Sequence, residues 1–173
     1  MISALGNFAA SARDEYPALM CWGNALWGYA AFHRYHQTRP AAERPGFLFT
    51  FAAVLTMWSM PGGIFTEKLC FGESPSVFGN TYVVCVHLIS CAAVYCSRGF
   101  ADYVASAAPF ALLDSLGLID NQTTAFNFME RAHVAHRGTS IVLLSGLTAC
   151  LAGATARHFL AHGFVAGGAS FDA

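Results

Sequence analysis

The chain has 173 residues, of which 55% are hydrophobic and only 11% are charged, and its formal net charge is −1. A soluble domain carries about 25% charged residues, so this composition favours a membrane protein over a soluble one. The length fits a single domain. The near-neutral charge excludes the strongly basic surface of a nucleic-acid-binding protein.

The apolar pattern predicts an all-α, polytopic transmembrane bundle of about five helices. Several apolar runs reach or approach the roughly 20 residues that a membrane span needs. A polar loop at 120–124 should separate the fourth span from a short amphipathic helix. The predicted spans are 18–35, 46–68, 77–97, 100–118 and 139–160, and the amphipathic helix is 124–137.

The second predicted helix contains Pro61, Gly62 and Gly63, which should kink it. At membrane depth such a break is tolerated only where the freed backbone groups are buried in protein or line a water-filled cavity. The break therefore has two interpretations, a kink packed against protein and a pore element.

Small and polar residues indicate which helix faces should pack inside the bundle. Ser145, Ala149 and Gly153 recur every four residues, which puts them on one face of the fifth helix. Small residues on one face let two helices approach closely in lipid. The alternative is a helix that is merely rich in Ala and Gly. Asn24, midway along the first helix, should face the bundle and form a hydrogen bond there.

Basic residues concentrate in the first connection, which carries Arg34, Arg39 and Arg44 against Glu43. Basic connections face the cytosol, matrix or stroma, so we expect this one on that side. A second basic cluster comprises Arg131, His133, His136 and Arg137. It is a candidate site for an anionic lipid head group. A solvated face and a contact with a partner protein are its alternatives.

No motif indicates catalysis, a metal or a cofactor. The chain has no nucleophile elbow, zinc-protease motif, P-loop or dinucleotide fingerprint. Its six cysteines form no Cys-x-x-Cys motif, and we predict buried free thiols. A bis-histidine haem needs two histidines within apolar spans, and only His87 lies in mid-span. We therefore predict a non-enzyme with no metal and no haem, in which a structural phospholipid is the expected ligand if any is bound.

The stretch from Tyr16 to Asp102 resembles the first three helices of the trimeric intracellular cation (TRIC) channels. An ordered set of short segments carries the resemblance: Tyr16-Pro17, Arg44-Pro45, Gly62-Gly63, Leu69-Cys70-Phe71-Gly72-Glu73, Phe78-Gly79-Asn80, Tyr95-Cys96 and Asp102. The family has glycine-broken second and fifth helices that line a pore within each subunit. The resemblance implies that Pro61, Gly62 and Gly63, with Gly146 and Gly153 in the fifth helix, occupy these positions.

The second half departs from the family pattern. The family's lipid-binding Lys-Glu-Val segment, followed by Arg, is best matched by Met129-Glu130-Arg131-Ala132-His133, which lacks the lysine. The fifth helix also lacks the family's lysine. The sequence after Gly163 is too short for another span, so we expect the sixth and seventh helices of the family to be missing. The resemblance therefore implies ancestry and architecture more strongly than conduction.

Two functions follow from the sequence. The first is a non-enzymatic accessory subunit of a larger membrane complex of the organellar respiratory or ATP-synthase type. Its partners would be membrane lipids and other membrane protein subunits, in the mitochondrial inner membrane rather than the endoplasmic reticulum. The second is a divergent intracellular monovalent cation (potassium) channel. In the first case, the break at 61–63 is an inherited kink packed against protein.

Overall fold

A computed structural model of the chain describes residues 7–8, 11, 14–59, 61–135 and 138–158. These residues form helices and connections without a strand, which confirms the all-α class. Two π-helical segments, Val54–Ser59 and Glu67–Phe71, extend α3 and α4. The α-helices are α2 (Pro17–His36), α3 (Phe47–Ala53), α4 (Pro61–Thr66), α5 (Thr81–Cys96), α6 (Arg98–Ser106), α7 (Ala108–Val134) and α8 (Thr139–His158).

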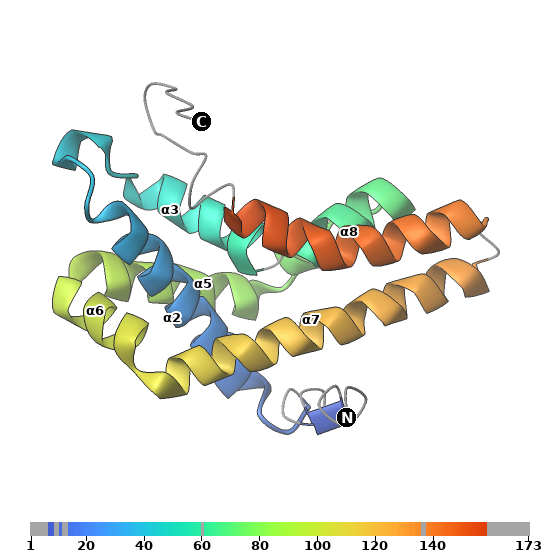
Figure 1. Cartoon of the computed structure of the whole chain (residues 1–173), viewed down its shortest axis with the longest axis horizontal. Helices are drawn as coiled ribbons and strands as arrows, with labels where there is room; N and C mark the ends of the chain where they lie inside the picture. Colours follow the sequence, from blue (N-terminus) through green and yellow to red (C-terminus); the bar gives the residue numbers. More distant parts are fainter. Residues whose placement is uncertain (1–6, 9–10, 12–13, 60, 136–137, 159–173) are drawn as a thin grey trace.

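The long helix α7 organises the arrangement (Figure 1). Its first half packs against α2, and α8 returns beside its second half. Helix α2 also packs against α5 and α6, whereas α4 packs against α8. The molecule thus has one cluster built around α2 and another built around α8, and α7 joins the two.

No single helix in the described part of the chain is both long and apolar enough to cross a bilayer. Two bent pairs reach that length and apolar character together. Phe47–Met57 and Gly62–Phe71 meet at 68°, and Thr81–Cys96 and Arg98–Ser106 meet at 112°. The helical nature of the bundle is therefore confirmed, and its polytopic insertion stays a prediction.

The region after α5 differs from the sequence prediction. Instead of a helix at 100–118, a loop at 120–124 and an amphipathic helix at 124–137, the structure has α6 and then α7, continuous from Ala108 to Val134. Pro109 starts α7 rather than interrupting a helix, because a first turn needs no N–H at that position. The polar run at 120–124 is helical because α7 packs against α2 on one side and α8 on the other. Such packing outweighs the weak helix propensity of the polar residues.

Polar caps fix where the neighbouring helices begin. The Asn80 side chain accepts a hydrogen bond from the Val83 N–H at 3.2 Å, so α5 begins at Thr81 rather than at residue 77. The Ser97 hydroxyl accepts one from the Phe100 N–H at 3.3 Å. This second cap starts α6 after a single extended residue and allows the sharp corner with α5.

Tyr29 ties three helices together in the apolar core. Its hydroxyl oxygen lies 3.2 Å from Nδ1 of His87 in α5 and 3.3 Å from the carbonyl oxygen of Phe51 in α3. Tyr29 and His87 are both almost completely buried. When His87 carries its proton on Nδ1, it donates to the Tyr29 oxygen and Tyr29 donates to the Phe51 carbonyl, so the Tyr29 hydroxyl is satisfied as both donor and acceptor.

Replacing Tyr29 by Phe should therefore destabilise the fold. The change leaves the buried Nδ1 of His87 without its Tyr29 partner, at a cost of about 1–3 kcal/mol. Tyr103→Phe is the matched control, because the Tyr103 side chain is 62% exposed. The midpoint of thermal unfolding, followed by circular dichroism in mild detergent, measures the difference. Equal midpoints for the two variants would contradict a stabilising role of the triad.

Candidate functional site

The predicted break lies where α3 passes into α4, and Pro61 is the first residue of α4. A proline is well tolerated there because its missing N–H needs no partner in a first turn. The preceding π-helical segment Val54–Ser59 shifts the backbone hydrogen bonds before the corner. Together these features produce the 68° bend between Phe47–Met57 and Gly62–Phe71.

Gly62 lies against the backbone of α8. A Cβ atom added to Gly62 would lie 2.5 Å from the Ala149 carbonyl oxygen, whereas one added to Gly63 would have nothing within 4 Å. Ser145 and Ala149 are buried on α8, at 0% and 6% exposure. This close approach requires small residues from both helices. Gly153 belongs to α8, but its packing lies outside the described part of the structure.

The two glycine positions expected to line a pore contact different helices. Gly62 in α4 lies against α8, whereas a Cβ atom on Gly146 would lie 2.5 Å from the sulfur of Met129 in α7. No described contact joins Gly62 with Gly146. The glycines of the second and fifth predicted helices therefore serve two separate packing contacts.

Asn24 faces α7, near Gly117. A Cβ atom on Gly117 would lie 2.5 Å from the Asn24 amide nitrogen, so Asn24 occupies the α2–α7 crossing. Among the described residues, its buried Oδ1 has no hydrogen-bond partner. The side chain thus turns inward, as the sequence suggested, without the hydrogen bond expected at that oxygen.

A clasp of Phe71, Glu73 and Arg131 fastens the end of the broken helix to α7. Gly72 adopts a left-handed conformation with φ of 72°, and the Glu73 N–H donates to the Glu67 carbonyl at 3.0 Å, which ends the helix. The Glu73 carboxylate then pairs with Nη2 of Arg131 at 2.5 and 2.6 Å. The Arg131 guanidinium also lies 4.4 Å from the centre of the Phe71 ring.

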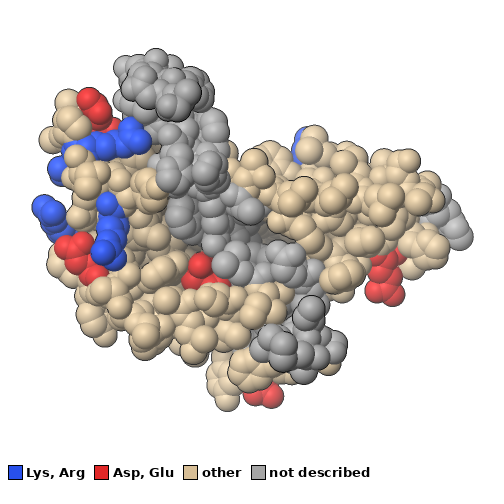
Figure 2. All heavy atoms as spheres, viewed as in Figure 1, with Lys and Arg blue, Asp and Glu red and all other residues tan. Residues whose placement is uncertain are grey.

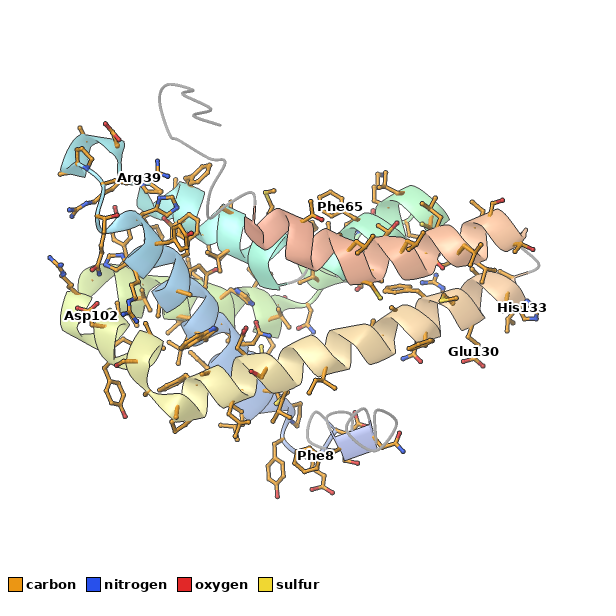
Figure 3. All side chains as sticks on the ribbon, in the orientation of Figure 1. Phe8, Arg39, Phe65, Asp102, Glu130 and His133 are labelled. Carbon is orange, nitrogen blue, oxygen red and sulfur yellow. The ribbon has the colours of Figure 1, made fainter. Side chains whose placement is uncertain are left out.

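The clasp changes how the second basic cluster is interpreted. The charge of Arg131 is neutralised within the chain by Glu73. His133 is exposed near the end of α7, where Figure 3 places it beside Glu130. His136 and Arg137 lie outside the described residues. Of the four residues named from the sequence, the structure therefore describes only Arg131 and His133, and the head-group site stays a prediction.

A polar network closes the opposite end of the molecule. The Arg44 side chain donates to the carbonyl oxygens of Arg39 and Gln37, each at 3.0 Å, and so caps α2. Gln37 in turn bonds to Asp102 at 3.5 Å and to Arg98 at 3.4 Å, which links α2 to α6. Beside this network lies a cavity of about 180 Å³ lined by Phe32, His33, His36, Gln37, Arg44, Pro45, Thr50 and Tyr95.

Charge is segregated along the molecule. Figure 2 shows acidic and basic side chains gathered at the end that holds the α2–α3 connection. Figure 3 places Arg39 and Asp102 at that end and Glu130 and His133 at the other. Within the described residues, no three His, Cys, Asp or Glu side chains are placed to hold a metal ion.

An apolar groove lies between the broken helix and α8, and its described lining contains no charged residue. The volume of the groove is about 500 Å³, and the α8 side of its lining includes Thr148 and Thr155. The groove is lined by Met57, Phe65, Leu69, Leu147, Thr148, Leu151, Ala152 and Thr155. The sequence analysis missed this surface, although the four-residue spacing of Leu143, Leu147 and Leu151 is the signal that marks its α8 side.

Comparison with known proteins identifies no relative. No known protein family matches the chain. No characterised protein and no solved structure is detectably similar to it. The resemblance to TRIC channels therefore stays a prediction, and the function has to be argued from the geometry.

Gly62→Ala should destabilise the chain, because the new methyl group meets the Ala149 carbonyl, which is backbone and cannot rotate away. Overpacking of this kind costs about 1–3 kcal/mol. Gly63→Ala is the matched control, and its better helix propensity should raise stability by about 0.5–1 kcal/mol. Thermal unfolding midpoints in mild detergent compare the two. A Gly62→Ala protein as stable as Gly63→Ala would rule out the tight contact.

The clasp predicts energetic coupling between Glu73 and Arg131. Both side chains are 46% exposed, so a double-mutant cycle with Glu73→Gln and Arg131→Gln should give a coupling of about 0.5–1 kcal/mol. The coupling should shrink at high salt. A parallel cycle of Glu130→Gln with Arg131→Gln should show none, because adjacent helical residues point apart. Equal coupling in both cycles would argue against the pairing.

Proposed function

We propose that this chain is a non-enzymatic structural subunit of a larger integral membrane assembly. The observation that carries the proposal is the exposed apolar face of α4 and α8. Leu143, Leu147 and Leu151 are 54%, 57% and 57% exposed, and Leu69 is 68% exposed. Soluble proteins rarely leave a contiguous apolar surface of this kind uncovered, and such a surface marks a contact with protein or membrane.

The distribution of charge supports a membrane environment. Figure 3 places Arg39 and Asp102 at one end of the molecule and Glu130 and His133 at the other, and the described lining of the groove contains no charged residue. A charge in the hydrocarbon of a bilayer is costly, so polar ends around an apolar middle are the distribution that a membrane subunit needs. The two bent helix pairs supply spans of sufficient length and apolar character.

The shape of the groove favours a helix of another subunit as its occupant. Ala152, Thr148 and Thr155 are small, and they lie beside the larger Leu147 and Leu151 on α8. Small residues next to bulky ones let a second helix approach closely in lipid. An assembly of the respiratory or ATP-synthase type in an organellar membrane, with the mitochondrial inner membrane first, is the setting that we infer.

The contact between Gly62 and Ala149 supports a scaffold over a cation channel. A channel built around the broken helix needs a hydrated path beside the break. At Gly62 the space is filled by the backbone of α8. We therefore interpret the TRIC-like features as an inherited architecture used for packing.

Leu147→Trp should release the chain from its assembly, because the larger side chain fills the groove. Leu112→Trp is the matched control, since Leu112 is 61% exposed on α7 and does not line the groove. Blue-native electrophoresis of mild-detergent membrane extracts measures the result. We expect wild type and Leu112→Trp to migrate in a large complex, and Leu147→Trp to shift to a small species.

Three outcomes would contradict the proposal. One is that the wild-type chain migrates only as a small homo-oligomer. Another is that alkaline carbonate extracts it from membranes. The last is that the purified chain carries potassium currents in planar bilayers, and that Gly63→Leu alters them. That substitution leaves the Ala149 contact intact, because a Cβ at Gly63 meets open space.

A further inference from the structure

One face of α2 forms a second groove, distinct from the groove between α4 and α8. Trp27, Ala31 and Arg34 recur at the four- and three-residue spacing that puts side chains on one side of a helix, and Thr38 lies in the turn that follows α2. The groove encloses about 410 Å³ and is open to the outside along its length. Its lining consists of Trp27, Ala31, Arg34, Tyr35, Thr38 and Ala105.

The groove changes character along α2. Trp27 and Ala31, with Ala105 of α6, give it an apolar floor, and Arg34 and Thr38 make its other end polar. From Trp27 to Arg34 the helix rises roughly 10 Å. One leaflet is about half of the roughly 30 Å hydrocarbon thickness of a bilayer. The helical part of the groove therefore fits within the depth of one leaflet.

Arg34 supplies a positive charge that the chain itself does not neutralise. Its side chain is exposed and forms no hydrogen bond or ion pair with any described residue. Of the other arginines at this end, Arg44 caps α2 and Arg98 bonds to Gln37, and Arg39 does not line the groove. An exposed guanidinium at the end of an apolar groove is complementary to a phosphate that carries an acyl chain.

We propose that the α2 groove binds one anionic phospholipid, with its phosphate at Arg34 and one acyl chain along Trp27, Ala31 and Ala105. This site replaces Arg131, whose charge is already paired, as the head-group contact. The basic α2–α3 connection belongs on the side whose leaflet is anionic. The inference rests on the membrane setting of the proposed function, and it is independent of the partner helix in the α4–α8 groove.

A lipid explains the groove better than its alternatives. Free phosphate would use Arg34 but gain nothing from the apolar floor. A partner helix in the α2 groove would need an acidic side chain to pair with Arg34. The α4–α8 groove, which we assign to a partner helix, has no charged residue in its described lining and makes no such demand. A phospholipid combines both parts of the required chemistry in one molecule.

Native mass spectrometry of the full chain, delipidated in mild detergent, tests the site. Phosphatidylglycerol, phosphatidylcholine and inorganic phosphate are titrated separately. We expect one phosphatidylglycerol to bind the wild type, with weaker binding of phosphatidylcholine and none of phosphate. Arg34→Gln should weaken phosphatidylglycerol binding about fivefold. The matched control Arg39→Gln removes a charge at the same end, outside the groove, and should leave binding unchanged.

A second pair of variants tests the acyl position. Ala31→Phe fills the floor while Arg34 stays in place, and it should also abolish the lipid adduct. Ala42→Phe, in the exposed turn Ala41–Glu43, is its control. Circular dichroism verifies that each variant is folded, and a variant that unfolds is replaced by Arg34→Lys or Ala31→Leu, for which we expect partial loss.

Several results would overturn the inference. Arg39→Gln weakening binding as much as Arg34→Gln would indicate diffuse attraction to a basic surface. Phosphate binding as tightly as the lipid would indicate a free-anion site. If folded Ala31→Phe bound phosphatidylglycerol as tightly as the wild type, the acyl chain could not lie in the groove. The assay uses the isolated chain, so failure of the lipid site and failure to find a host complex are separate results.

Discussion

The contact between Gly62 and the Ala149 carbonyl is the constraint on which the rest of the structure depends. It lets the backbones of α4 and α8 touch directly at the bend. The bend then directs the segment after α4 toward the end of α7, where Phe71 and Glu73 meet Arg131. A side chain at position 62 would push α4 away from α8 and would move the clasp with it.

Helix α8 shows why this packing leaves a surface for others. On one side of α8, the backbone of Ala149 contacts Gly62 of α4. On another side, Gly146 contacts the side chain of Met129 in α7. Both contacts use small residues, and both positions are occupied within the chain. The remaining side, marked by Leu143 and Leu147, is exposed. The small residues of α8 thus pack against helices of the same chain, whereas its large apolar residues are exposed and can contact other molecules.

The sequence predicted what local patterns encode. The all-α class and the bend at Pro61 follow from apolar runs and from the backbone preferences of proline, whereas the second helix ends at Phe71, three residues beyond its predicted end. The continuity of α7 was missed because its polar stretch is held by contacts with α2 and α8, which no local pattern records. The pairing of Arg131 was missed for the same reason, because its partner Glu73 is 58 positions away.

The two grooves divide the remaining surface between two kinds of partner. One groove is built from α2 and α6 and the other from the broken helix and α8, and they share no residue. An occupant of one therefore takes no contact from the other, so lipid and partner subunit can be bound together. The backbone of Ala149 fills the space beside Gly62, so the break packs against protein there. Under the proposals above, the α4–α8 groove would take a helix and the α2 groove a lipid, the two kinds of contact that a scaffold in a membrane complex requires.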